Sequence, residues 1–251
     1  MRNVRITLNV GVACVLLLAR RYDARRTEEG VLMAHAKFEG VIFDMDGTLL
    51  DTLPDLVVVT NHALAQEGFS PRTQSEVLSY VGNGGLSLVR QACGEGATEE
   101  QIARVFATFR GAYAEVGMDL TKEFEGMTST LQALRDAGVK TGIMSNKFEA
   151  GVLDVQQRFM PGLFDSVHGE SDVIPRKPEP EGLWLCAKEM GVDPSRCAYV
   201  GDSVSDMRAA RNAGMFAVAA AWGYQPREDL EAEAPDAMID CPQELLAVAG
   251  L

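Results

Sequence analysis

Short apolar runs alternate with helix-length segments from residue 38 to the end of the chain. Five runs have the length and composition of buried strands: 40–44, 139–146, 163–169, 197–202 and 215–222. Helical segments follow, several of which end just before a glycine: 128–137, 180–190 and 206–213. Strands that alternate with helices predict an α/β fold with a parallel sheet covered by helices on both faces.

One interval departs from this alternation. Between Thr52 and Gly126 the pattern is helical throughout, with one segment that begins at Pro54. A second begins at Thr98 and Gln101, which have the spacing of a capping box. We therefore expect a helical cap domain over residues 54–126, inserted into a core formed by residues 37–53 and 127–251.

Residues 1–36 form a separate N-terminal extension, in which arginines flank an apolar run at 6–19. The run is shorter than the roughly 20 residues that span a bilayer, and no small-residue cleavage site follows it. A membrane role is therefore not expected, although an anchor or organelle-targeting peptide stays open. The simpler interpretation is a non-native start, because Met33 directly precedes the segment AHAKFEGVIFDMDGTLL, which contains the first predicted strand.

Composition narrows the function. The chain of 251 residues has a net charge of −13, which argues against binding to nucleic acid. An anionic substrate would need local positive charge from a metal ion, a lysine or backbone amides. The five cysteines are scattered without a pairing or zinc pattern, so we expect a cytoplasmic protein with reduced thiols.

The first predicted strand ends in the sequence Asp44-Met45-Asp46-Gly47-Thr48. Two carboxylates at the carboxyl edge of a parallel sheet stand where ligands bind in open α/β folds. One carboxylate can attack phosphorus while the other transfers a proton, and Gly47 allows backbone amides to approach an oxyanion. Taken alone, the motif is equally typical of a turn that caps a helix.

Two later segments add groups that suit a phosphate. Ser145 and Asn146 end the second strand, where a hydroxyl and backbone amides form an anion cradle, although both residues also favour plain helix caps. Lys177 precedes a proline in a rigid loop and can supply a point charge to phosphate.

The fourth strand ends at Asp202, and Asp206 follows one helical turn later. Mg²⁺ takes one or two carboxylates together with phosphate oxygens and water. Asp44 and Asp202 are therefore the predicted Mg²⁺ pair, and Asp206 could orient a metal-bound water.

These four segments, DMDGT, SN, KPEP and GDSVSD, resemble the motifs of the haloacid dehalogenase-like hydrolase superfamily, which has a Rossmann-like core. The helical insertion resembles the cap of its phosphoglycolate phosphatase and β-phosphoglucomutase branch. The stretch YVGNGGLSLVRQA at 80–92 is similar to the phosphoglycolate phosphatases in particular.

The resemblance implies a role for each matching residue. Asp44 would form an aspartyl-phosphate, and Asp46 would protonate the leaving alcohol and then activate water. Mg²⁺ would be held by the Asp44 carboxylate, the Asp46 backbone carbonyl and Asp202. Ser145 and Lys177 would contact the phosphoryl group, with Gly47, Thr48 and Asn146 as further binding residues. Dehalogenases lack an aspartate at the position of Asp46, so halide chemistry is not expected.

The glycine-rich stretch 81–86 either closes over the substrate or forms an ordinary turn between helices. Within and after it, Asn83 and Arg90 are candidate substrate contacts, Arg90 for a carboxylate. The first hypothesis is a Mg²⁺-dependent phosphatase, monomeric or homodimeric, that acts on a small phosphometabolite, with 2-phosphoglycolate the leading substrate. A sugar-phosphate mutase and, less favoured, a non-catalytic phosphoryl-binding regulator are the alternatives.

Overall fold

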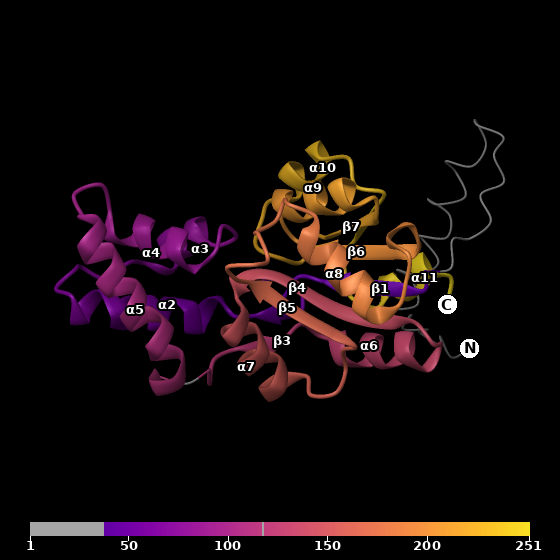
Figure 1. Ribbon diagram of the computed structural model, residues 1–251, viewed down its shortest axis with the longest axis horizontal. Coiled ribbons are helices and arrows are strands. Elements are labelled where there is room, and N and C mark those ends of the chain that lie inside the picture. The colour runs from indigo at the N-terminus through magenta and orange to yellow at the C-terminus, as the bar shows by residue number, and fades with distance from the viewer. Residues whose placement is uncertain (1–37, 117) are drawn as a thin grey trace, which may run out of the picture. The chain divides into compact units, whose positions relative to one another are not determined.

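The computed structural model describes residues 38–116 and 118–251, so the predictions for residues 1–36 lie outside the described residues. Its central sheet has six parallel strands in the order β5-β4-β1-β6-β7-β8 (Figure 1). Their bounds are β1 Gly40–Phe43, β4 Lys140–Phe148, β5 Ser166–Glu170, β6 Cys197–Gly201, β7 Phe216–Ala220 and β8 Ala237–Ile239. The predicted α/β class and parallel sheet are confirmed.

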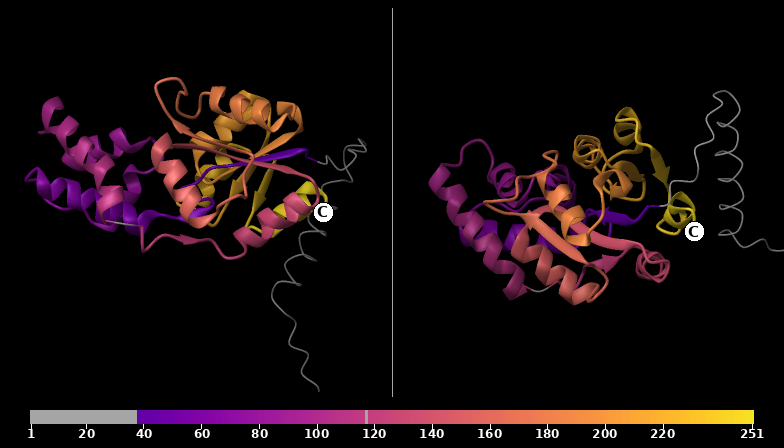
Figure 2. Two further views of the ribbon diagram at one scale, coloured as in Figure 1. Left: turned by 60° about the horizontal axis from the view of Figure 1, so that its bottom comes forward. Right: turned by 45° about the vertical axis from the view of Figure 1, so that its right-hand side comes forward.

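Helices cover both faces of this sheet (Figure 2). One face packs against α6 Met127–Asp136, α7 Glu149–Phe159 and α11 Glu244–Ala249; the other packs against α8 Glu181–Met190, α9 Val204–Ala213 and α10 Arg227–Ala232. Alternation along β1 explains how the strand serves both layers, because Val41 and Phe43 enter one apolar cluster and Ile42 the other. The predicted helix ends also hold, since Gly191 and Gly214 adopt left-handed conformations there.

After β1 the chain leaves the sheet and forms α2 Leu53–Gln66, α3 Gln74–Tyr80, α4 Gly85–Cys93 and α5 Glu99–Val116, before α6 leads back to β4. We call Leu53–Val116 the helical insertion. Buried side chains such as Val59, Leu88 and Val105 pack its helices together. The predicted capping box is present at α5, where Thr98 N donates to Gln101 Oε1 and Gln101 N donates to Thr98 Oγ1.

A short antiparallel pair joins the insertion to the core, formed by β2 Leu50–Asp51 and β3 Lys122–Glu123. The sequence predicted no strand between Thr52 and Gly126, so β3 corrects that expectation. Two-residue strands carry no readable alternation. Strand β8 and helix α7 were also not among the predicted elements. Among the described residues, no helix is both long and apolar enough to cross a bilayer.

Candidate active site

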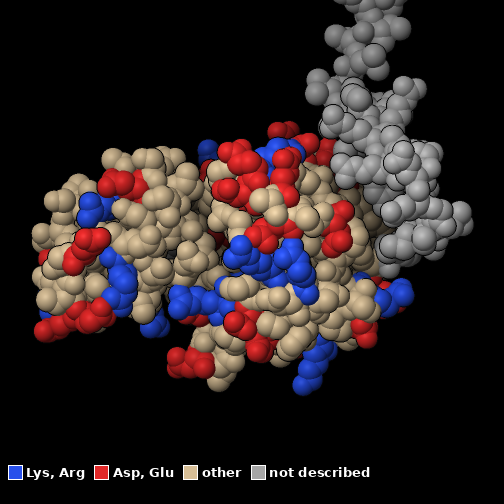
Figure 3. All heavy atoms as spheres, turned by 90° about the horizontal axis from the view of Figure 1, so that it is seen from above, with Lys and Arg blue, Asp and Glu red and all other residues tan. Residues whose placement is uncertain are grey.

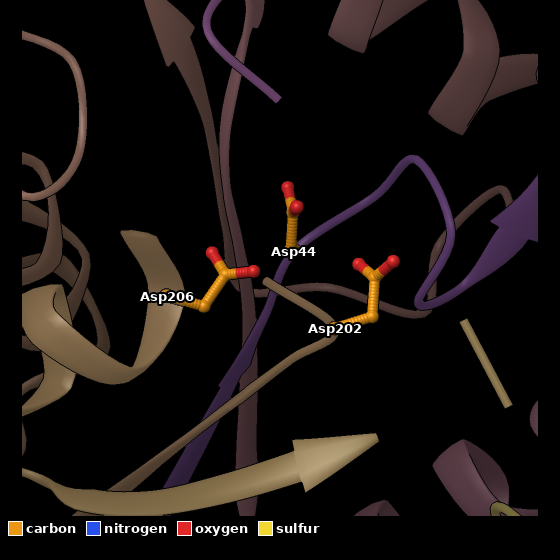
Figure 4. A group of neighbouring side chains, drawn as sticks. All are labelled: Asp44, Asp202 and Asp206. Carbon is orange, nitrogen blue, oxygen red and sulfur yellow. The ribbon is translucent and has the colours of Figure 1, made fainter. Parts of the chain in front are cut away.

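The strand order changes direction at β1. The chain runs from β1 outward through β4 and β5, then returns to the other side of β1 for β6, β7 and β8. Such a reversal opens a crevice at the carboxyl ends of the strands. Asp44 follows β1 and Asp202 follows β6, so both stand at this crevice. Asp206 joins them from α9, and one oxygen from each of the three lies within 4.8 Å of the others (Figure 4).

Lys177 is buried among these carboxylates, with a side chain only 1% exposed. Its Nζ lies 2.9 Å from Asp44 Oδ1, 2.7 Å from Asp206 Oδ1 and 2.9 Å from the Tyr199 hydroxyl. An ammonium group has three protons, and these three partners account for all of them. Burial acts to lower the pKa of Lys177, but the attraction of Asp206 and Asp44 outweighs it and raises the pKa above its usual value.

Asp206 is held by protein donors at both of its oxygens. Oδ1 faces Lys177 and lies 3.0 Å from the Tyr199 hydroxyl, while Oδ2 accepts from Ser203 N at 3.0 Å and Ser203 Oγ at 2.6 Å. The pair with Ser203 forms a capping box that begins α9. Asp206 thus fixes Lys177 and the start of α9. That Asp206 orients a metal-bound water stays a prediction.

Asp202 sits in a cradle that only glycine permits. Its Oδ1 accepts from Thr48 Oγ1 at 2.9 Å, and its Oδ2 accepts from Tyr224 N at 2.7 Å. A Cβ at Gly47, whose φ is +85°, would lie 2.3 Å from Asp202 Oδ2, and a Cβ at Gly223 would lie 2.1 Å from Asp202 Cβ. Gly47 therefore gives space to the Asp202 carboxylate, while its own N–H donates to Leu50 O at 2.9 Å. Its approach to an oxyanion stays a prediction.

The acidic cluster carries more negative charge than its protein partners balance. Burial raises the pKa of Asp44 to about 6, a rise that Asp206 and Asp46 assist and Lys177 opposes. Burial together with the charges of Asp206 and Asp44 raises the pKa of Asp202 to about 8. Three carboxylates against one ammonium leave an excess of two negative charges, and oxygen ligands suit a hard divalent cation. This donor set could hold a metal ion.

Asp46 has a separate environment on the cavity side of the motif. Its Oδ1 accepts from Thr52 Oγ1 at 2.7 Å, and Lys147 Nζ lies 3.2 Å from Oδ1 and 3.3 Å from Oδ2. The Lys147 side chain is 4% exposed, so this is a desolvated ion pair. Sequence reasoning did not select Lys147, although it stands two positions after Ser145 on the same strand and so shares its direction.

Ser145 and Asn146 directly precede Lys147 in the buried part of β4. Ser145 Oγ accepts a hydrogen bond from Lys147 N at 3.3 Å. Asn146 Oδ1 accepts from Lys177 N at 2.8 Å, and its Nδ2 donates to the carbonyl oxygens of Gly82, at 2.8 Å, and Lys177, at 3.3 Å. Asn146 thereby connects the loop of Lys177 with the helical insertion.

A cavity of about 50 Å³ lies between the helical insertion and the core. The core contributes polar groups and one aromatic ring, from Asp44, Asp46, Ser145, Asn146, Lys147 and Phe148. The insertion contributes apolar side chains and glycine backbone, from Leu56, Val81, Gly82, Gly84, Gly85, Leu88 and Phe109. The cavity thus has a charged wall and an apolar wall.

Two sequence candidates lie away from this cavity. Within the described residues, neither Asn83 nor Arg90 is among those that line it. Arg90 instead forms an exposed two-point ion pair with Glu99, in which one contact, Nη2 to Oε2, measures 2.8 Å. The spacing along a helix predicts which residues share a face, but it does not predict which face meets the core. We therefore assign Arg90 no substrate contact.

Tyr224 and Trp222 were also missed by the sequence analysis. The Tyr224 hydroxyl accepts from Thr52 N at 2.8 Å and Leu53 N at 2.9 Å, and lies 3.0 Å from Asp51 Oδ1. Trp222 Nε1 donates to Thr48 O at 3.1 Å. These bonds tie the start of the helical insertion to the loop after β7. Aromatic residues next to a strand end are common in cores, so the sequence carried no specific signal.

The surface outside the crevice mixes both signs of charge. In Figure 3, acidic and basic side chains both occur among the described residues, and basic side chains gather near the middle of the view next to acidic ones. At the crevice itself, Lys177 and Lys147 are buried cations.

Comparison with known proteins places this site in a family. Residues 41–220 match the family described as haloacid dehalogenase-like hydrolase. The chain belongs to that family.

Similar curated proteins include an N-acetylmuramic acid 6-phosphate phosphatase of Pseudomonas aeruginosa, 32% identical over 86% of this chain and 96% of the relative. A phosphoglycolate phosphatase of Pseudomonas putida is 35% identical over 82% of this chain and 78% of the relative. The solved structure of a predicted phosphoglycolate phosphatase from Haemophilus somnus superimposes with a TM-score of 0.79, at 27% identity, and covers 86% of this chain and 99% of that one. The predicted family and phosphatase class are confirmed by these relatives.

Proposed function

We propose that this phosphatase is a Mg²⁺-dependent phosphomonoester hydrolase that works through an aspartyl-phosphate on Asp44. The observation that carries the proposal is the pairing of two carboxylates with different surroundings at one cavity. Asp44 is buried beside Lys177, while Asp46 is bound by Thr52 and Lys147. One carboxylate can then act as nucleophile and the other as acid and base.

The hydrogen bonds of Asp44 select an attacking oxygen. Within the described residues, Lys177 Nζ and Met45 N both contact Oδ1, at 2.9 and 2.7 Å. Oδ2 is then the oxygen that attacks phosphorus, while the two donors hold the carboxylate in one rotamer. A fixed orientation of the nucleophile lowers the entropic cost of an in-line attack.

Asp46 is proposed to transfer the proton. In its acid form it would protonate the leaving alcohol, and as a carboxylate it would then take a proton from the attacking water. Thr52 and Lys147 orient the Asp46 carboxylate, and part of this carboxylate still faces the cavity.

Mg²⁺ is proposed to be held by the carboxylates of Asp44 and Asp202 and the backbone carbonyl of Asp46. When bound, it supplies positive charge to the phosphoryl oxygens. Lys177 and Ser145, with Gly47, Thr48 and Asn146 nearby, complete the binding of the phosphoryl group. Thr48 also orients Asp202 through its 2.9 Å hydrogen bond. Phosphoryl transfer depends mainly on such positioning and neutralisation of charge.

The domain predicted from sequence, residues 54–126, includes nearly all of the helical insertion. We propose that it acts as a cap over a core of residues 37–53 and 127–251. The substrate is a small phosphorylated metabolite, and 2-phosphoglycolate is the leading candidate because several relatives carry that name. We place the enzyme in the cytoplasm, since the cysteines of the described residues are all free thiols. It would act as a monomer or homodimer.

A phosphate-release screen tests this proposal. The full chain is incubated with Mg²⁺ and with 2-phosphoglycolate, N-acetylmuramic acid 6-phosphate and glucose 1-phosphate in parallel, followed by a wider panel of monophosphates. We expect free phosphate from at least one monoester, dependence on Mg²⁺ and no activity in Asp44→Asn. Isomerised sugar phosphate without free phosphate would instead show a mutase, and activity retained in Asp44→Asn would contradict the mechanism.

A further inference from the structure

Residues 81–85 join α3 to the first turn of α4 and are one of the parts of the helical insertion that reach the catalytic edge of the sheet (Figure 1). We call them the glycine loop. Val81, Gly82, Gly84 and Gly85 line the cavity together with Asp44 and Asp46. Because three of these four loop residues are glycines, the loop presents mostly backbone to the cavity, and the free space depends on where that backbone is held.

Two side chains of the core hold this backbone by its carbonyl oxygens. Asn146 Nδ2 donates to Gly82 O at 2.8 Å, and Arg176 Nη1 donates to Asn83 O at 2.6 Å. Each donor directly adjoins a proposed catalytic residue in sequence, Asn146 after Ser145 and Arg176 before Lys177. The position of the glycine loop is thus set from the same two segments that bind the phosphoryl group.

Arg176 is itself fixed in place although its side chain is 42% exposed. Its Nε lies 3.2 Å from Glu170 Oε1, at the end of β5. The glycine loop packs closely against this pair, because a Cβ at Gly84 would lie 2.6 Å from Glu170 Oε2 and 3.1 Å from Arg176 Cδ. Gly84 also has a φ of +82°, which side chains rarely adopt. Arg176, Glu170 and Gly84 therefore set a single position for the loop.

We propose that Arg176 is a specificity-determining residue that acts through the glycine loop. This inference rests on the proposed phosphatase function. By holding Asn83 O, Arg176 keeps the loop close to Asp46 and limits the alcohol part of the substrate to a small group. Without that bond the loop recedes, a bulky alcohol is accommodated more easily, and a small alcohol loses contacts with the apolar wall.

The test compares two substrates across four variants of the full chain with Mg²⁺. The small substrate is 2-phosphoglycolate, or whichever alkyl monophosphate the screen shows to be hydrolysed fastest, and the bulky one is p-nitrophenyl phosphate. The variants are Arg176→Ala, Arg176→Lys and Gly84→Ala, the last of which displaces the loop from its own side. Arg208→Ala is the control, since Arg208 lies on α9, is a partly exposed arginine like Arg176 and pairs with Glu233.

Selectivity is measured as kcat/KM for the small substrate divided by kcat/KM for the bulky one. We expect this ratio to fall about tenfold in Arg176→Ala, which corresponds to ~1.4 kcal/mol. Gly84→Ala should lower the ratio in the same direction, mainly through KM of the small substrate. The ratio for Arg176→Lys should lie between those of Arg176→Ala and the wild type. Arg208→Ala should match the wild type in both the ratio and the melting temperature.

An unchanged ratio in Arg176→Ala would overturn the inference. So would an equal loss of kcat for both substrates, because that result would mean that Arg176 acts on the neighbouring Lys177 and not on the loop. Failure of the proposed function gives a different result, visible in the wild type alone: no phosphate released from any monoester.

Discussion

The two walls of the cavity are held in place by different means. On the core wall, Lys177 has three partners, Asp206 has donors at both oxygens, and Asp202 is enclosed by glycines. On the insertion wall, the glycine loop is held by one hydrogen bond from Asn146 and one from Arg176. The proposed chemistry thus depends on a network of buried charge, and the proposed choice of substrate depends on two hydrogen bonds, one from the buried Asn146 and one from the partly exposed Arg176.

The largest expected effect on activity comes from removing the proposed nucleophile, Asp44. Asp44→Asn keeps the size of the side chain but cannot form the aspartyl-phosphate, so kcat should fall by at least about 10⁴-fold, as for other covalent catalysts. Steady-state phosphate release measures the loss. Asp165→Asn, which removes a surface carboxylate paired with Arg135 and Lys140, should retain activity within a few-fold of the wild type. Comparable activity in both variants would refute the role of Asp44.

Replacing Lys177 should damage chemistry and stability together. Lys177→Met leaves Asp44 and Asp206 buried without their cation, and loss of one partner of a buried pair costs about 3 kcal/mol or more. We expect kcat to fall by roughly 10² to 10³-fold, the range for removal of one group that stabilises the transition state. Chemical denaturation at pH 8 measures the stability. Unfolding free energy equal to that of the wild type would contradict a buried network centred on Lys177.

Replacement of Lys147 tests how the core wall of the cavity orients Asp46. Lys147→Met removes the ion pair at 3.2 Å, and misplacement of the acid should lower kcat by about 10 to 100-fold. Lys147→Arg should recover part of the loss, because it restores a cation beside Asp46. Lys140→Met is the control on the same strand, an exposed lysine that pairs with Asp165. Unchanged kcat in Lys147→Met would remove Lys147 from the mechanism.

The smallest expected effect concerns pH and Mg²⁺. The pKa values of about 6 for Asp44 and about 8 for Asp202 exceed the ordinary 3.8, so the metal-free folded state binds more protons than the unfolded state. The stability from these groups is present below about pH 4 and is lost as pH rises toward 8.

Thermal unfolding should therefore give a melting temperature that falls with pH in chelator, and Mg²⁺ should raise it more at pH 8 than at pH 5.5, by about 5 °C. Asp202→Asn should show a weaker pH dependence and little response to Mg²⁺. If Mg²⁺ stabilised the protein equally at both pH values, and did the same in Asp202→Asn, the cation would bind at a site other than Asp202.

The same contrast explains what the sequence could predict. Asp44, Ser145 and Asp202 end apolar runs of strand length, and parallel strands bring their carboxyl ends to one edge. These three residues of the core wall could therefore be placed at one edge of the sheet from the sequence. Lys147 escaped notice because its burial depends on Asp46, a partner 101 positions away. Tyr199 and Tyr224 likewise act through partners that become neighbours only after folding.

The insertion wall was harder to predict. Arg90 was a candidate because it lies just after the glycine-rich stretch, but it pairs with Glu99 on α5, and the docking of one helix on another has no local signature. The pair β2 and β3 was missed because two residues per strand carry no periodicity. The glycine-rich stretch was recognised, while its contacts with Asn146 and Arg176 required the fold.

The most direct test of the account is a search for the phosphoryl group on the enzyme itself. Wild-type protein and Asp46→Asn, in which hydrolysis of the intermediate should slow, are mixed with the best substrate and Mg²⁺, quenched in acid and mapped by mass spectrometry. We predict that one phosphoryl group is found on the peptide that contains Asp44, in a larger fraction of the Asp46→Asn protein. A phosphoryl group on another residue, or turnover by an Asp44→Asn protein, would contradict the assignment of Asp44 as the nucleophile.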